Sequence, residues 1–197
     1  SAMRERSVGL GVMGFHSLLQ REMIPIESSM ARVLNKRIFR HIKTQADAVS
    51  RKLAFERGPC PDAAEHGIME RFSNKIAVAP TASISVICGQ SSPGIEPNVA
   101  NSYNDKRLMG SIPIRNAALK TVLQKYGQDN DKVWSSIVTQ KGSVQHLDFL
   151  NEKEKAVFKT AFEIDQMSLI ALAGDRAPFI CQAQSLNLFM PANTHKK

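Results

Sequence analysis

The chain has 197 residues, a formal net charge of +8 and a hydrophobic content of 43%. This length and apolar share suffice for the core of one domain or for part of a larger one. No apolar run is long enough to cross a membrane, and no signal peptide opens the chain. The basic residues are dispersed and not interleaved with aromatic residues, which argues against a nucleic-acid surface. Three widely spaced cysteines without a Cys-x-x-Cys pair predict free thiols in a reducing, cytoplasmic setting.

The first predicted unit is a strand followed by a helix. Residues 8–12 form a short apolar run of strand type. The helix continues through Phe15, Leu18 and Leu19, and Pro25 ends it.

The longest predicted helix begins at Ser28 or Ser29, either of which is a suitable N-cap, and runs to about Glu56. Gly58 and Pro59 then stop it. The apolar positions recur at close to 3.6 residues and predict the buried face: Met30, Val33, Leu34, Ile38, Ile42, Val49 and Leu53.

A second strand-to-helix corner follows a short helix or turn-rich connector at residues 62–72. Residues 76–79 form an apolar run of strand type, and Pro80 ends the strand pairing. Thr81 is expected to be the N-cap of a helix that Gly89 stops.

The first turn of that helix has the chemistry of an anion site. Its backbone N–H groups lack intrahelical acceptors and lie at the positive end of the helix dipole. Ala82 and Ser83 carry small side chains, so an anion can approach the backbone closely. The corner is therefore a candidate phosphate cradle, although an ordinary helix cap has the same pattern.

Helix dominates the rest of the chain after residues 90–115, which look irregular. Further helices are predicted from Asn116 to near Gly127, from Asp131 to Gly142, over residues 155–164 behind a capping-box-like Asn151 and Glu154, and around Met167, Ile170, Leu172 and Ala173. A strand is expected near the end of residues 179–189. Strands separated by helices predict an α/β fold with a parallel sheet.

Gly9, Gly11 and Gly14 satisfy the dinucleotide-binding pattern G-x-G-x-x-G. The strand before them is short, and Glu27 lies at a helix start and not after a second strand. Tight packing of a strand against a helix is therefore the preferred interpretation of these glycines. No histidine is paired with a carboxylate at ligand spacing, so no metal site is predicted. Cys88, in an apolar stretch, is expected to be a packed thiol.

Five landmarks follow one another along the chain: residues 6–14, residues 46–58, the sequence APTASIS at 79–85 with GIEP at 94–97, residues 142–145 and residues 175–189. In sequence and order they resemble the large, catalytic subunit of class I ribonucleotide reductase. The resemblance implies a helix-rich part, roughly half, of a ten-stranded α/β barrel. It divides the chain into a vector-derived start at residues 1–3, a partial catalytic barrel domain at residues 4–191, and a polar tail at residues 192–197.

The resemblance also implies which residues bind substrate. In that family the loop after the strand holds the substrate phosphates with backbone N–H groups and with hydroxyls such as those of Thr81 and Ser83. The corresponding residues are Pro80, Thr81, Ala82, Ser83 and Ile84. Ser85 and Glu96 are expected to support the loop, although Glu96 before Pro97 is equally consistent with a surface turn. Ile84 stands where some relatives have a hydroxyl.

The family reduces ribonucleoside diphosphates by thiyl-radical chemistry. The resemblance implies a radical-generating small subunit with a metal centre and a thioredoxin-type reductant as partners. The radical cysteine with its Asn and Glu neighbours, the paired tyrosines and the reductant cysteine pair are not recognisable here, so no catalytic residue, metal or cofactor is assigned to this chain. Alone it is expected to be inactive and to self-associate, because the rest of the large subunit would cover its open edge.

Two alternatives remain open. The chain is also consistent with the product of a split gene, a subunit that completes a barrel with a separate chain. The other alternative is a free-standing nucleotide-binding module that uses residues 9–14. Sequence alone does not separate the first alternative from a part of a longer reductase.

Overall fold

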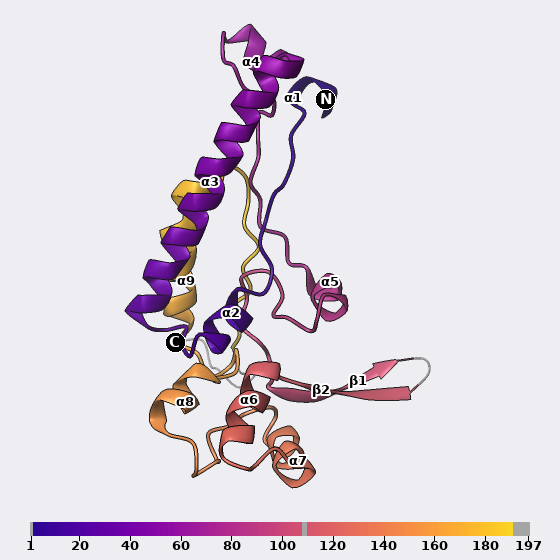
Figure 1. Ribbon diagram of the computed structural model, residues 1–197, viewed down its shortest axis with the longest axis vertical. Helices are drawn as coiled ribbons and strands as arrows, with labels where there is room; N and C mark the ends of the chain where they lie inside the picture. The colour runs from indigo at the N-terminus through magenta and orange to yellow at the C-terminus, as the bar shows by residue number, and fades with distance from the viewer. Residues whose placement is uncertain (1, 108–109, 191–197) are drawn as a thin grey trace.

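The computed structural model describes residues 2–107 and 110–190. A single long helix, α3 (Ser29–Arg57), forms the spine of the elongated molecule (Figure 1). The Ser28 hydroxyl caps it by accepting a hydrogen bond from the amide of Ala31, and Gly58, with φ of +79°, ends it. Both boundaries agree with the sequence prediction.

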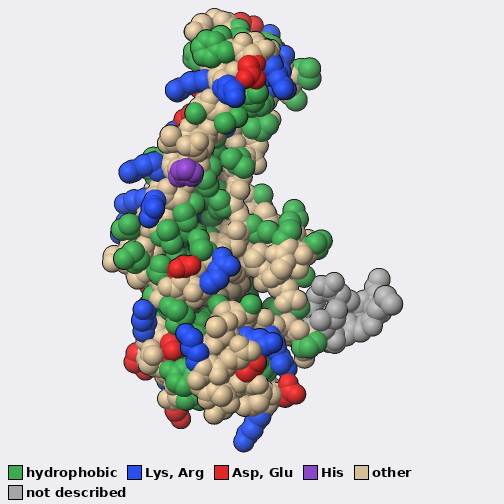
Figure 2. All heavy atoms as spheres, in the orientation of Figure 1, with side chains coloured by type: hydrophobic (Ala, Val, Ile, Leu, Met, Phe, Trp, Pro, Cys, Tyr) green, Lys and Arg blue, Asp and Glu red, His purple; other side chains and the backbone are tan. Residues whose placement is uncertain are grey.

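The buried face of α3 agrees with the predicted one only in part. Its buried positions follow a spacing near four residues and include small and polar side chains: Ala31, Asn35, Phe39, Ser50 and Ala54. Met30, Val33 and Val49 are exposed. Figure 2 shows Lys and Arg side chains along α3 with apolar side chains between them. The other predicted positions, Leu34, Ile38, Ile42 and Leu53, are partly buried, and Leu34 and Ile38 pack against the core.

Helices α2 (Phe15–Arg21) and α9 (Gln166–Arg176) pack beside α3, and the short 3-10 helix η1 (Ala177–Phe179) continues α9 (Figure 1). They enclose one hydrophobic core, made of Phe15, Leu19, Ile26, Ala31, Phe39, Val78, Ile95, Ile164, Leu169 and Leu172. The predicted helix around residue 170 is confirmed, but its apolar Met167 and Ile170 are exposed.

Three extended segments run beside the helices in parallel. Leu10 pairs with Ile76, and Val78 pairs with Gln184, each through a single parallel bridge. The amide of Val78 donates to the carbonyl of Ala183 at 3.1 Å, and the amide of Ser185 donates to the carbonyl of Val78 at 2.9 Å. In the described part of the chain the predicted strands and parallel sheet are therefore reduced to two single parallel bridges, with residues 76–78 in the centre.

A hairpin was missed by the sequence analysis. Strands β1 (Ser102–Arg107) and β2 (Gly110–Arg115) pair antiparallel, with Ser102 opposite Arg115, and project from the body (Figure 1). A proline at position 113 and the polar residues of β1 interrupt the alternation that signals a strand. The segment was therefore expected to be irregular, which is wrong.

Short helices form the two ends of the molecule. Helices α1 (Ala2–Glu5) and α4 (Pro61–Glu65) lie beside the end of α3. At the other end, α6 (Ala117–Lys125), α7 (Asp131–Thr139) and α8 (Glu152–Val157) enclose a second core around Trp134 and Phe158.

The caps of this second group agree with the sequence. Asn116 accepts hydrogen bonds from two first-turn amides of α6, and Asn151 with Glu154 forms the predicted capping box of α8. The helix expected over residues 155–164 is wrong in length, because α8 ends at Val157. The carboxylate of Glu163 accepts hydrogen bonds from the amide and hydroxyl of Thr160, which stabilises a turn instead. Within the described part of the chain, no helix is long and apolar enough to span a membrane.

Candidate phosphate-binding site

Helix α5 (Ala82–Ile87) follows the central extended segment at its carboxyl end. Thr81 occupies the N-cap position but adopts the left-handed conformation, with φ of +49°, and its side chain makes no capping hydrogen bond. The predicted capping role of Thr81 is therefore wrong. Ala82, Ser83 and Ile84 form the exposed first turn of α5, whose amides have no acceptor within a helix.

The hydroxyl of Thr81 binds elsewhere in the loop. Its Oγ1 accepts a hydrogen bond from the amide of Gly94 at 2.8 Å. Gly94 has φ of +46°, and a Cβ at this position would lie 2.8 Å from the carbonyl oxygen of Ala79. Only a glycine fits between the two backbone segments. The motifs APTASIS and GIEP are thus joined in space as well as in sequence order.

The segment before Gly94 also caps α2. The amides of Gly14 and Ser17 donate to the carbonyl and the hydroxyl of Ser92, at 2.9 and 3.1 Å. The amide of Phe15 donates to the carbonyl of Gly94 at 3.3 Å. These are the amides that a dinucleotide phosphate would need in the G-x-G-x-x-G interpretation. Here they are used within the protein.

Close packing explains the middle glycine of that pattern. A Cβ at Gly11 would lie 2.4 Å from the carbonyl oxygen of Ala77, so any side chain would separate the first two extended segments. Gly14, with φ of +80°, turns the chain into α2. The geometry therefore agrees with the packing interpretation of the glycines.

The two residues expected to support the loop are both buried. Ser85 donates from its hydroxyl to the carbonyl of Ala82 at 2.8 Å. Glu96 accepts a hydrogen bond from the side-chain amide of Asn187 at 2.8 Å. Glu96 is therefore not part of a surface turn; it ties the GIEP segment to the last extended part of the chain.

A network of amide side chains lies behind the loop, and sequence reasoning missed it. The side-chain oxygen of Gln20 accepts hydrogen bonds from the side-chain amides of Asn98 and Asn116, at 3.0 and 2.9 Å. The side-chain amide of Asn116 also donates to the side-chain oxygen of Asn101. The backbone amide of Asn98 donates a hydrogen bond to Nδ1 of buried His16, and burial lowers the pKa of His16 to about 3. A neutral histidine therefore holds the far end of the 92–98 segment.

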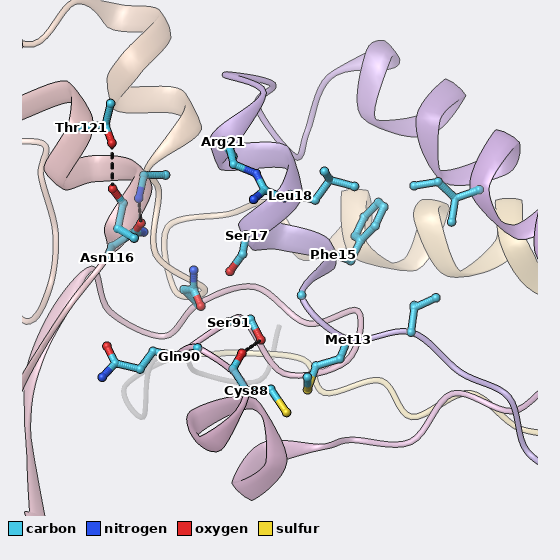
Figure 3. A pocket seen from close by; sticks show the side chains of 17 residues that line it. Met13, Phe15, Ser17, Leu18, Arg21, Cys88, Gln90, Ser91, Asn116 and Thr121 are labelled. Carbon is cyan, nitrogen blue, oxygen red and sulfur yellow. Dashed lines mark hydrogen bonds between the residues drawn. The ribbon is translucent and has the colours of Figure 1, made fainter.

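Two cavities adjoin this network. The larger, of 640 Å³, lies between α2, the turn after α5 and the start of α6, with Arg21 and Ser17 on its wall (Figure 3). The smaller, of 370 Å³, is lined by Ala82 and Ser85 of α5 and by Ile114 of β2. The helix side of the candidate loop thus faces the smaller cavity.

The cysteines carry no evident chemistry at this site. Cys88 is exposed and lines the larger cavity. The prediction that its thiol is packed in the interior is therefore wrong. Cys181 accepts hydrogen bonds at its Sγ from the amides of Lys75 and Ile76, at 3.1 and 3.2 Å. Within residues 2–107 and 110–190, no group of three or more His, Cys, Asp or Glu side chains could hold a metal ion.

Parallel extended segments with helices packed beside them define a barrel-type α/β domain, and a loop of small residues lies at the carboxyl end of its central segment. The family described as "Ribonucleotide reductase, barrel domain" matches residues 1–67 and 61–197. The chain belongs to this ribonucleotide reductase family, and its fold is part of the α/β barrel.

Known relatives agree with the family match. The "Ribonucleoside-diphosphate reductase large subunit" of Invertebrate iridescent virus 3 is 45% identical over 192 residues, which cover 96% of this chain and 30% of the relative. A putative large subunit from Frog virus 3 is 43% identical over 196 residues, covering 100% of this chain and 34% of the relative. The solved "Actinobacillus ureae class Id ribonucleotide reductase alpha subunit" has a TM-score of 0.87 at 37% identity, covering 95% of this chain and 34% of that one. The chain thus spans about a third of the length of these relatives.

Proposed function

We propose that this chain forms part of the catalytic barrel of a ribonucleoside-diphosphate reductase large subunit, and that its 80–84 loop binds the substrate phosphates. The observation that carries the proposal is the exposed, uncapped first turn of α5 at the carboxyl end of the central segment. A diphosphate there would receive hydrogen bonds from the amides of Ala82, Ser83 and Ile84, while Pro80 and Thr81 shape the entry. The family match supports this assignment.

In this proposal, the reduction of the ribonucleotide also requires other proteins and the rest of the large subunit. The rest of the large subunit supplies the radical cysteine and the acid–base residues, and a radical-generating small subunit carries the metal centre. A thioredoxin-type reductant restores the dithiol. The part played by this chain is to bind and orient the diphosphate, and the backbone does this without any change in protonation.

Diphosphate binding tests the loop assignment. Titration of the chain with a ribonucleoside diphosphate to millimolar concentration is expected to shift the backbone amide resonances of residues 81–85. In Ala82→Asp, a carboxylate enters the cradle and should abolish these shifts while the circular dichroism spectrum is kept. Ala117→Asp, in the first turn of α6, is a matched control that should leave the shifts unchanged. If the amides of residues 9–14 respond instead, the assignment is wrong.

An activity assay tests whether the radical chemistry belongs to the rest of the large subunit. The chain mixed with a radical-generating subunit and a dithiol should form no deoxynucleotide, because the hydrogen-abstracting cysteine is assigned to the rest of the large subunit. Formation of deoxynucleotide by this mixture would contradict that division.

A further inference from the structure

The outward face of α3 concentrates positive charge, and Figure 2 shows Lys and Arg side chains along this helix. The only carboxylates of α3 are Asp47 and Glu56, so the first half of the helix has none. Exposed helices are ordinarily stabilised by opposite charges placed three or four positions apart. Here Arg32, Lys36 and Arg40 follow one another at four-residue spacing, and like charges at that spacing repel. This arrangement favours a negative charge supplied from outside the helix.

A groove of 470 Å³ lies on this face of the helix. It is lined by Val33, Lys36, Arg37, Arg40, His41 and Thr44. All of these residues belong to α3, and none of them has a carboxylate. From the first to the last of them the helix rises by about 17 Å. The groove therefore has the length of a short peptide segment, and its charged walls are cationic.

The cations of the groove differ in how far the chain itself neutralises them. Lys36 pairs with Asp175 of α9 at 3.0 Å. The guanidinium of Arg40 lies 5.7 Å from the centroid of the Phe179 ring, which orients it without neutralising it. Within the described part of the chain, neither Arg37 nor Arg40 forms an ion pair. Two guanidinium groups, which suit carboxylates because they donate in pairs, are thus available to a partner.

We propose that this groove is a docking site for an acidic segment of another protein. Carboxylates of that segment pair with Arg37 and Arg40, and an apolar side chain beside them covers Val33. In the chain alone Val33 is 61% exposed. The inference goes beyond the proposed function and does not depend on the 80–84 loop.

The composition of the groove favours a peptide over other anionic partners. Surfaces that bind single-stranded nucleic acids combine cations with aromatic side chains on which bases stack. The residues that line the groove include neither Phe, Tyr nor Trp. A helix that lies on an anionic membrane needs a free apolar face, whereas the buried face of α3 packs into the core. Cations beside one exposed aliphatic residue instead match an amphipathic segment that carries Asp or Glu next to Leu or Ile.

Fluorescence anisotropy tests the proposal with the whole chain. The probe is a labelled synthetic peptide of about 20 residues, long enough to form a helix, with Glu along one face and Leu beside it. A peptide with Gln in place of every Glu is the control. We expect the Glu peptide to bind with an affinity that falls as salt is added, because salt screens exposed charges. The Gln peptide should not bind measurably.

Charge reversal locates the binding site. Arg37→Glu should weaken binding of the Glu peptide about tenfold, because it removes an attraction and adds a repulsion. Lys52→Glu makes the same change of net charge on the same helix but outside the groove. It should bind within about twofold of the parent chain. Val33→Ser should weaken binding about threefold, since the apolar contact is lost. Circular dichroism confirms that each variant is folded.

Three results would overturn the proposal. One is an equal loss in Arg37→Glu and Lys52→Glu, which would mean attraction by net charge alone. Another is failure of the parent chain to bind the Glu peptide. The third is tighter binding of a DNA duplex or of phosphatidylserine vesicles than of the peptide, abolished by Arg37→Glu. That result would assign the groove to nucleic acid or to a membrane surface.

Discussion

Two adjacent residues at the end of α9 show how environment decides the role of a charge. Asp175 accepts hydrogen bonds from Arg32 at 2.6 and 2.9 Å and pairs with Lys36 at 3.0 Å. Arg176 is only 1% exposed and donates to the side-chain oxygens of Asn35 and Gln184. Burial lowers the pKa of Arg176 to about 10, so it remains charged at neutral pH. Asp175 thus links α9 to α3 through ion pairs with exposed cations, whereas Arg176 is buried between these two helices.

The first prediction concerns Asp175. The hydrogen bonds from Arg32 lower the pKa of Asp175 from 3.8 to about 2. A carboxyl whose pKa is lower in the folded chain stabilises it above the unfolded pKa, and that contribution is lost as the pH falls through the folded value. Asp175→Asn should therefore lower the free energy of unfolding by about 1 kcal/mol at pH 7, a small value because both cations are half exposed.

Urea unfolding at several pH values checks this. The difference between the parent chain and Asp175→Asn should be constant above about pH 5 and shrink toward pH 2. Glu56→Gln, which breaks the exposed pair between Lys52 and Glu56, is the control and should change stability by less than about 0.5 kcal/mol. A pH-independent difference would contradict the assigned cause.

At the scale of elements, α3 is held by tertiary packing of its buried face. Phe39 lies 1% exposed in the core with Phe15, while Phe55, on the same helix, is 74% exposed. Lys75 also holds α3 through ion pairs, because its ammonium pairs with Asp47 of α3 at 2.9 Å and with Glu70 at 3.1 Å. The helix thus depends on a few contacts along its length, and its exposed apolar residues contribute little to them.

The second prediction compares two identical substitutions in this helix. Phe39→Ala should lower the free energy of unfolding by about 3–5 kcal/mol, because it leaves a cavity in the core. Phe55→Ala should change it by less than about 0.5 kcal/mol, since the ring already contacts solvent. Urea unfolding followed by circular dichroism measures both. Equal losses would show that the exposed face of α3 is covered in solution.

On the scale of the whole molecule, the central extended segment around Ile76 is better covered than the outer segment around Leu10. Leu10 is 51% exposed, although its bridge partner Ile76 is 2% exposed. Val8, on the same outer segment, is also exposed. An apolar edge of this kind favours pairing with another chain.

The third prediction is self-association through that edge. Light scattering at micromolar concentration should give a mass above that of one chain. Leu10→Lys places a charge on the edge and should shift the mass toward the monomer. Val138→Lys, at an exposed position on α7, is the control and should leave the mass unchanged. A monomeric parent chain would contradict the prediction.

Local signals in the sequence determined most helix starts and the family. Ser28, Asn116 and Asn151 cap their helices as predicted, because a cap depends on side chains within three residues of it. The separated motifs identified the ribonucleotide reductase family, which the family match confirms. Parallel order of the three extended segments also followed from the alternation of strands and helices.

Contacts between distant residues were decided only by the tertiary structure. The buried face of α3, the hairpin of β1 and β2, and the amide network around Gln20 each depend on partners far along the chain. The same holds for Thr81, whose sequence context predicts a helix cap. Its hydroxyl instead accepts a hydrogen bond from the amide of Gly94, because folding brings the 94–97 segment within hydrogen-bonding distance, and Thr81 has a positive φ. No pattern within one turn of a helix can encode a donor that lies thirteen residues further along the chain.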